Sequence, residues 1–407
     1  MAQIPGPKAR KVVERINKYT VPGTYAYPLV IKNGKGCYLQ DVDGNWYLDF
    51  NANVCTAAVG YGDPEIMKCL KECAQNSAHK IAGQDFYIEE QADLAEKLLK
   101  IVPRPLRKVF FVNSGAEAIE NAIKFAYREK GPLPGVSMKG AFHGRTLGAL
   151  TFTHSKPVHK KNYPELQHLI VNFCTRDADL NVFEIDRVLA ERDVAFVLTE
   201  VVQGEGGYNI ASKRFLKNLR DVTKENGIPL ILDEIQSGMG RTGEWWAFQH
   251  YKITPDVMTV AKSLQVGATI TTESYNPNEA GAVGSTWGGG DRIDLAVGFQ
   301  TIEIIERRKL LQNAGKMGTY FLKRLKEIEE RYPKKLSNSR GLGLMLAVDF
   351  PNKMMRDTVE QEAFKTKLLL LGCGFTSIRF CPPLIISREE IDKGLDVFEK
   401  VVKNLPI

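Results

Sequence analysis

The sequence predicts an α/β fold: a large domain with a mostly parallel sheet covered by helices, and a smaller α+β domain formed by both termini. Short, continuously apolar runs alternate with helical patterns through the middle of the chain, which is typical of a parallel sheet buried on both faces. The two ends instead combine strand-like alternation with long helical patterns. We place the large domain at residues 56–295 and the small domain at residues 1–55 and 296–407.

Composition and charge narrow the function classes. The chain has 407 residues, 43% hydrophobic and 25% charged, which is ordinary globular composition with room for a large core. Its 55 basic and 48 acidic side chains leave a net charge of +7 without any basic run, so we expect no nucleic-acid partner. No apolar stretch approaches the ~20 residues of a membrane span, and no export signal is visible.

Cysteine and histidine usage points to a reducing compartment and no metal. The seven cysteines include no CxxC pair, and the six histidines show no metal-binding spacing. We therefore expect reduced thiols, a cytoplasmic protein and no protein-built metal site.

The large domain is expected to contain four apolar strands and two helices among them. The strands are at 108–112, 194–199, 228–232 and 257–261, and the helices at 116–128 and 214–225.

The small domain combines the two ends of the chain. Residues 30–50 carry glycines among alternating strand-like residues, which predicts short antiparallel strands. The C-terminal part is expected to contain one long helical pattern over 294–330, strands at 343–350 and 377–381, and helices at 360–371 and 389–405.

Polar side chains follow each apolar run of the large domain. Ser114-Gly115-Ala116 follows the first run, Glu200 the second, Asp233 the third and Lys262 the fourth. Open parallel sheets bind ligands at the carboxyl ends of their strands, so these groups are expected at one edge. Each alone has a structural explanation, such as a helix cap or a solvated lysine.

Together these groups match the needs of one cofactor. The turn that opens the helix at Ser114-Gly115-Ala116 offers free N–H groups to a phosphate. A buried Lys262 has a lowered pKa and can form a Schiff base, whereas a buried Asp233 needs a cationic partner such as a protonated pyridine nitrogen. Phosphate seat, amine and carboxylate are what pyridoxal phosphate requires.

A glycine motif offers a competing interpretation. Gly238-Met-Gly-Arg-Thr-Gly243 matches GxGxxG after a strand. A dinucleotide site also needs a helix opening at the motif and an acid about 20 residues further on. Neither is evident, so we interpret the motif as a glycine-rich loop of the site.

Specific motifs run along nearly the whole chain. They are Asn113-Ser-Gly-Ala-Glu-Ala, Phe142-His-Gly-Arg-Thr, Gln203-Gly-Glu-Gly-Gly, Asp233-Glu-Ile-Gln, Ala261-Lys-Ser-Leu, Ser285-Thr-Trp-Gly-Gly and Arg379-Phe-Cys-Pro-Pro-Leu. With them the sequence resembles the class III aminotransferases, pyridoxal-phosphate enzymes of fold type I. Stretches around Thr153-His-Ser-Lys and Lys262-Ser-Leu-Gln are most similar to 4-aminobutyrate and lysine ε-aminotransferases.

The resemblance implies cofactor roles at matching positions. Lys262 would form the Schiff base and then move the proton, and Asp233 would pair with the pyridine nitrogen. The other implied cofactor contacts are Ser114, Gly115 and Ala116 at the phosphate, Gln236 at the phenolic oxygen, Phe142 on the ring face, and His143 beside it. Thr286 would reach the phosphate of a neighbouring subunit, which implies a homodimer or dimer of dimers with shared active sites.

It also implies substrate roles. Arg379 would grip the α-carboxylate of glutamate or 2-oxoglutarate, Glu200 would pair with Arg379 while an ω-amine is bound, and Arg145 would bind the distal carboxylate. Gln265-Val266, Tyr61 and Asp63 depart from the family pattern, so the exact amine stays open.

The expected activity is transfer of the terminal amino group of an ω-amino acid, such as 4-aminobutyrate, lysine or ornithine, to 2-oxoglutarate by a ping-pong mechanism. An amino-acid racemase or epimerase on the same fold is the alternative, since fold does not separate the two. The expected Glu200–Arg379 pair favours transamination. A non-catalytic regulator with this fold is less favoured, because no flanking segment has the size of a DNA-binding domain.

Overall fold

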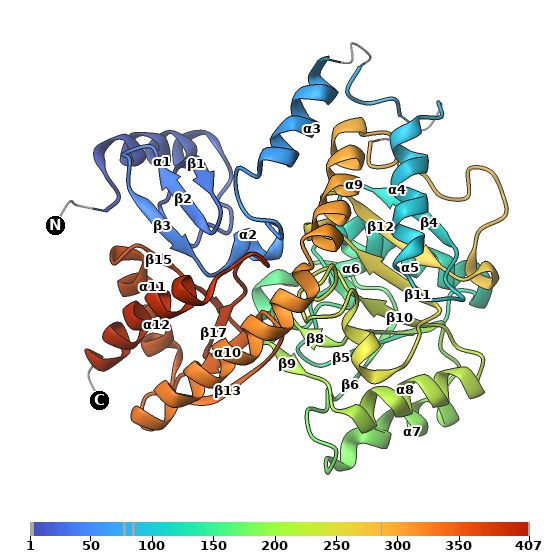
Figure 1. Ribbon diagram of the computed structural model, residues 1–407. Coiled ribbons are helices and arrows are strands. Elements are labelled where there is room, and N and C mark those ends of the chain that lie inside the picture. Colours follow the sequence, from blue (N-terminus) through green and yellow to red (C-terminus); the bar gives the residue numbers. More distant parts are fainter. Residues whose placement is uncertain (1–3, 76–78, 84–85, 286, 406–407) are drawn as a thin grey trace.

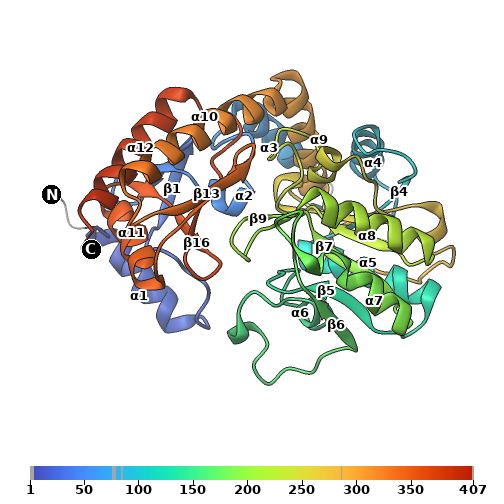
Figure 2. The ribbon, with the colours of Figure 1, turned by 90° about the horizontal axis from the view of Figure 1, so that it is seen from below.

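The computed structural model describes residues 4–75, 79–83, 86–285 and 287–405 (Figure 1). The N-terminal and C-terminal segments lie together on one side, and the middle of the chain forms the other side. Figure 2 shows the same division, with α1, α11 and α12 grouped away from α5, α7 and α8. Among these residues no helix combines the length and apolar character needed to cross a bilayer.

A seven-stranded sheet organises the large domain, and its mostly parallel character confirms the predicted fold class. Every neighbouring pair is parallel except at β12, which is antiparallel to both of its neighbours. The sheet order is β4 (Lys108–Val112), β12 (Gly267–Thr271), β11 (Val257–Val260), β10 (Leu230–Asp233), β7 (Phe196–Glu200), β5 (Gly135–Met138) and β6 (His168–Val171).

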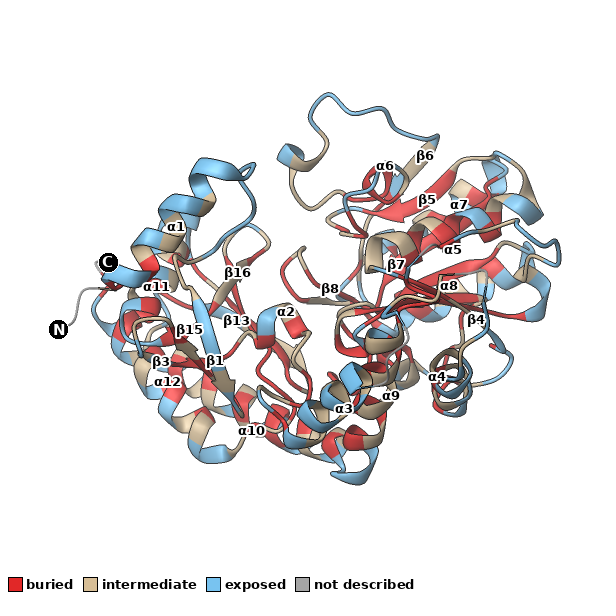
Figure 3. Cartoon of the chain, turned by 90° about the horizontal axis from the view of Figure 1, so that it is seen from above, coloured by how far each residue is buried: buried red, intermediate tan, exposed pale blue. Residues whose placement is uncertain are grey.

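Helices cover both faces of this sheet because successive strand residues point to opposite sides. Ile231 and Val257 pack with residues of α5 (Gly115–Lys130), whereas Leu232 and Met258 share a core with residues of α8 (Lys213–Glu225). Figure 3 shows the central strands buried and the outer faces of the helices exposed. The other helices of this part are α3 (Pro64–Gln75), α4 (Glu89–Lys100), α6 (Leu147–Thr151) and α7 (Glu184–Glu191).

The smaller part contains two sheets, and one of them joins the two ends of the chain. β1 (Ile31–Lys35), β2 (Tyr38–Asp41) and β3 (Trp46–Asp49) are antiparallel, and β15 (Leu368–Leu369) adds to β3 in parallel. The other sheet has the order β13 (Ser337–Leu342), β14 (Met345–Asp349), β17 (Ser377–Phe380) and β16 (Leu371–Cys373). The expected combination of both ends is therefore present, and the boundaries at 55/56 and 295/296 stay a prediction.

Helix boundaries in the C-terminal part differ from the sequence-based expectation. The helical pattern over 294–330 is two helices, α9 (Arg292–Arg307) and α10 (Leu310–Arg331), because Lys309 turns the chain at a φ of 54°. The helix expected at 360–371 is α11 (Lys353–Lys365), since the leucines after it form β15. The chain also contains α1 (Pro7–Tyr19), α2 (Ala52–Cys55) and α12 (Arg388–Lys403).

The short segment α2 is left-handed. Ala52, Asn53, Val54 and Cys55 have φ angles of 46°, 49°, 56° and 68°, which are strained for residues with side chains. The Ser263 hydroxyl donates to the Cys55 carbonyl at 2.6 Å, so this turn is tied to the residue next to Lys262. The small domain thereby contacts the loop that carries the lysine.

Candidate active site

A cavity of about 670 Å³ lies at the carboxyl ends of the parallel strands, where the sequence predicts the site. Most of the predicted residues line it. They are Ser114, Gly115, Ala116, Phe142, His143, Arg145, Glu200, Asp233, Gln236 and Lys262. Thr286 lies outside the described residues.

The first side of the cavity is the N-terminus of α5. Ser114 caps this helix by accepting a hydrogen bond from the Glu117 N–H at 3.3 Å. The first N–H groups of a helix have no partner within it and attract anions. A Cβ added at Gly115 would lie 2.9 Å from Ile235 Cδ1, so the tight packing favours glycine here. The arrangement fits a phosphate group.

Lys262 follows β11 and is half-buried at the cavity wall. Its backbone has a φ of 49° and starts a short turn in which Gln265 N–H donates to the Lys262 carbonyl at 2.9 Å. Burial lowers the pKa of the Lys262 ammonium. A larger neutral fraction makes this amine a better nucleophile and base.

Asp233 ends β10 beside a buried histidine. Its Oδ2 accepts a hydrogen bond from His143 Nδ1 at 2.8 Å, and its Oδ1 accepts from the Ile235 N–H at 2.9 Å. The backbone N–H of His143 donates to Thr153 Oγ1 at 2.9 Å. Asp233 therefore has a fixed orientation at the cavity wall, where a cationic ring nitrogen would complete its partners.

Glu200 occupies the strand position next to Asp233. The two residues are paired in the register of β7 and β10, and both are buried. Glu200 accepts hydrogen bonds from the N–H groups of Phe142 at 3.1 Å and Gly204 at 2.8 Å. Burial is the main cause that raises the Glu200 pKa to about 7, and the nearby Asp233 charge adds to it. Glu200 thus holds the Phe142 loop against the site.

The expected pair between Glu200 and Arg379 is wrong. Arg379 on β17 donates from Nη1 to Glu205 Oε1 at 2.7 Å. Glu200 points into the large domain toward its backbone donors, whereas Glu205 lies on the turn between β8 (Val202–Gln203) and β9 (Asn209–Ile210), which reaches the small domain. The Gly374 N–H donates to the Glu205 carbonyl at 2.7 Å, which fixes that contact.

Glu205 is the partner of Arg379 that the sequence interpretation missed. Burial opposes its ionisation, but the Arg379 charge outweighs it, with help from Lys156, and lowers the Glu205 pKa to about 2. A signal was present, because Gly204, Gly206 and Gly207 around this acid mark a turn that presents its side chain.

The remaining predicted groups are at the mouth and the small-domain side of the cavity. Phe142 is half-buried, and its ring stands edge-on to His159 with centroids 5.7 Å apart. Arg145 is exposed at the mouth. Arg379 is buried, and its Nε has no partner among the described residues.

The structure does not support a dinucleotide site at the GxGxxG motif. The glycine segment from Gly238 to Gly243 continues into a short turn at Ala247–Tyr251, and no α-helix opens there. The Arg241 side chain of this segment is buried and donates to the Pro382 carbonyl. The segment therefore packs between the two parts of the molecule.

The comparison with protein families settles what kind of protein has this site. The model of the family "Aminotransferase class-III" matches residues 19–402. The chain belongs to the class III aminotransferases. This aminotransferase accordingly uses pyridoxal phosphate, an amino acid and a 2-oxo acid.

Known relatives cover nearly its whole length. The acetylornithine aminotransferase of Archaeoglobus fulgidus is 36% identical over 95% of this chain and 98% of its own. A 4-aminobutyrate aminotransferase of Dictyostelium discoideum is 31% identical over 99% of this chain and 90% of its own. An alanine/serine racemase of Pyrococcus horikoshii is also 31% identical, over 98% of this chain and 91% of its own.

A solved structure gives the same fold. Lysine aminotransferase from M. tuberculosis, in the internal aldimine form, is 27% identical and has a TM-score of 0.90 over 97% of this chain and 99% of its own.

The described residues fit the cofactor. Three groups needed by the cofactor line the cavity. They are the N-terminus of α5 with its glycine at Gly115, the amine of the half-buried Lys262 and the carboxylate of the buried Asp233. The Gln236 Oε1 is buried without a partner among the described residues and lines the same cavity. A polar group in the cavity would satisfy it.

Proposed function

We propose that this aminotransferase moves the terminal amino group of an ω-amino acid, such as 4-aminobutyrate, lysine or ornithine, to 2-oxoglutarate in two alternating half-reactions. The observation that carries the proposal is the buried ion pair of Arg379 and Glu205, which lies beside the cavity containing Lys262. A carboxylate that competes with a substrate carboxylate for one arginine suits an enzyme that alternates two substrates.

The protein's own residues divide the work. When bound, pyridoxal phosphate supplies an aldehyde that condenses with amines and a protonated ring that accepts electrons. Gly115 and Ala116 hold the phosphate, and Asp233, oriented by His143, keeps the ring nitrogen protonated. Lys262, with its lowered pKa, takes the proton from the reacting carbon and returns it at the neighbouring position.

Arg379 and Glu205 adapt the site to both substrates. With an ω-amino acid, the reacting carbon has no carboxylate, and Glu205 neutralises Arg379. With 2-oxoglutarate, the α-carboxylate takes the planar guanidinium and displaces Glu205. Arg145 at the mouth binds the carboxylate that both substrates carry at their far end.

We extend the proposal to assembly and location. Thr286 would complete the phosphate site of a second copy, so the active enzyme would be a homodimer or a dimer of dimers. The large domain would cover 56–295. The seven free cysteines support a reducing, cytoplasmic compartment.

A racemase is the second candidate, because one relative with this activity is 31% identical over most of the chain. Racemisation handles one substrate class and has no need of a switch at Arg379. Deuterium uptake at an α-carbon without any dependence on 2-oxoglutarate would favour the racemase.

Half-reaction spectroscopy tests the proposal. The holoenzyme is mixed separately with 4-aminobutyrate, ornithine, lysine and common α-amino acids, and the absorbance of the bound cofactor is followed. We expect an ω-amino acid to bleach it and 2-oxoglutarate to restore it. The Lys262→Ala variant should lose both the borohydride-reducible adduct and turnover. Normal turnover by this variant would refute the assignment.

A further inference from the structure

Glu205 is shared by two cations, one at each of its carboxylate oxygens. Arg379 Nη1 lies 2.7 Å from Glu205 Oε1, and Lys156 Nζ lies 3.6 Å from Oε2. The Arg379 side chain is 3% exposed and that of Lys156 is 42% exposed. Lys156 is not among the residues that line the cavity, so it faces Glu205 from outside the substrate space.

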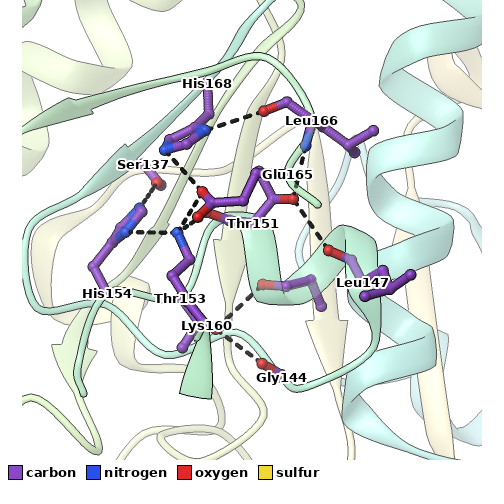
Figure 4. A network of polar contacts seen from close by, with 11 residues as sticks. Ser137, Gly144, Leu147, Thr151, Thr153, His154, Lys160, Glu165, Leu166 and His168 are labelled. Atoms are coloured by element: carbon purple, nitrogen blue, oxygen red, sulfur yellow. Dashed lines mark hydrogen bonds and ion pairs between the residues drawn. The ribbon is translucent and has the colours of Figure 1, made fainter. Parts of the chain in front are cut away.

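The segment that carries Lys156 is fixed to the large domain (Figure 4). His154 N–H donates to the Ala141 carbonyl at 2.7 Å, and the His154 ring lies 2.8 Å from Ser137 Oγ. Lys160 Nζ donates to the Thr151 carbonyl at 2.7 Å and thereby holds the far end. Lys156 lies between these two anchors, so its backbone is already in place before a substrate arrives.

Release of Arg379 creates an electrostatic problem. Once a substrate carboxylate takes Arg379, Glu205 has lost its shortest ion pair while it is still largely buried, at 17% side-chain exposure. A buried carboxylate without a cation is unfavourable, and this penalty would oppose binding of the substrate. A cation that can stay close to Glu205 as its side chain moves would remove this penalty. Lys156 has a long, flexible side chain and only one ion pair at 4.0 Å or less among the described residues, the one with Glu205.

We propose that Lys156 is a positioning residue that receives Glu205 when an α-carboxylate displaces it from Arg379. The inference rests on the proposed function and deepens it. Lys156 thereby favours the state in which Arg379 is free, and selectively improves binding of the substrate that has two carboxylates.

Binding of unreactive analogues to the holoenzyme tests this role. Glutarate carries both carboxylates, whereas butyrate carries only the one expected at Arg145. We expect Lys156→Met to weaken glutarate about threefold or more in isothermal titration calorimetry and to leave butyrate nearly unchanged. Lys156→Arg should restore glutarate binding, and Lys161→Met, which removes a charge from the same segment at an exposed position, should have no effect.

Steady-state kinetics and a structure give independent readouts. Lys156→Met should raise KM for 2-oxoglutarate with little change in KM for the ω-amino acid. In a glutarate complex, Glu205 should move away from Arg379, and its distance to Lys156 Nζ should become shorter than the present 3.6 Å. Equal weakening of both analogues, or no weakening, would overturn the inference, as would a Glu205 that turns away from Lys156.

The failure of the proposed function gives a different result. In that case Arg379→Met would bind glutarate as well as the unaltered enzyme does, and no ω-amino acid would bleach the cofactor. Such a result would refute the exchange of Glu205 for a substrate carboxylate at Arg379, and not only the role of Lys156 in that exchange.

Discussion

Replacing Arg379 by methionine tests the ion pair at the centre of the proposed switch. The change keeps a long side chain but removes the guanidinium that donates to Glu205 at 2.7 Å. Glu205 then remains in a largely buried position with Lys156, at 3.6 Å, as its remaining ion-pair partner among the described residues. We expect both a loss of stability and a selective loss of the acceptor half-reaction.

The magnitude follows from the pKa of Glu205, which falls from 4.5 to about 2 in the folded protein. Each pH unit corresponds to about 1.4 kcal/mol, so ionised Glu205 stabilises the fold by about 3 kcal/mol, mostly through Arg379. Because the folded pKa is the lower one, this contribution is complete above pH ~4.5 and disappears as pH falls toward 2. Arg379→Met should therefore cost about 3 kcal/mol at pH 7, and its deficit should shrink in acid.

Urea unfolding of the holoenzymes at pH 7 and pH 3 measures this effect. The control is the double variant Arg379→Met with Glu205→Met, which removes the stranded charge and should recover most of the loss. Single-turnover mixing with 2-oxoglutarate should show binding weakened about 100-fold, since two charge-assisted hydrogen bonds are lost. A deficit below about 1 kcal/mol at pH 7, or a double variant as unstable as the single one, would refute the reasoning.

Three other changes probe the site and its surroundings. Asp233→Asn should retain the cofactor but lower kcat at least about 100-fold, because an amide does not stabilise a protonated ring nitrogen. Single-turnover absorbance measures this rate, and a normal rate would contradict the role assigned to Asp233. Glu234 is buried, with its pKa raised to about 7 mainly by burial, so its stabilisation is complete below pH ~4.5 and declines as pH rises toward 7. In the Glu234→Gln variant, the free energy of unfolding in urea should fall less between pH 5 and pH 7, by up to about 3 kcal/mol. The same fall as in the unaltered enzyme would contradict this expectation. Gly115→Val places carbon atoms against Ile235 and should weaken cofactor binding about tenfold or more. The circular dichroism spectrum should stay unchanged. An unaltered cofactor affinity would contradict the tight packing proposed around Gly115.

The gathering of polar site residues at one edge of the large sheet was predictable, because it follows from a local sequence pattern. Each apolar run ends in a polar group, and parallel strands bring those ends together whatever the loops do. Ser114, Asp233 and Lys262 therefore appear in one cavity as expected. The antiparallel direction of β12 does not affect this, since β4 on its far side runs parallel to β11 again.

Contacts between the two parts of the chain were not predictable in the same way. Glu200 is the last residue of β7, and Glu205 lies five residues further on, in the turn between β8 and β9. Which one meets Arg379 depends on a turn that reaches across to β16 and β17, a contact between residues more than 170 positions apart. Likewise, Lys309 divides one helical pattern into two helices, although a lysine has no preference for the left-handed backbone that it adopts.

The pairing of β3 with β15 has a consequence for biosynthesis. Leu48 pairs with Tyr38 of β2 on one side and with Leu368 on the other, so the N-terminal sheet gains its fourth strand only when the last tenth of the polypeptide leaves the ribosome. The seven-stranded sheet is complete by residue 271 and has no such delay. Cofactor-binding side chains are thus synthesised well before Arg379, and a chain that stops early would retain the cradle while lacking the means to hold an α-carboxylate.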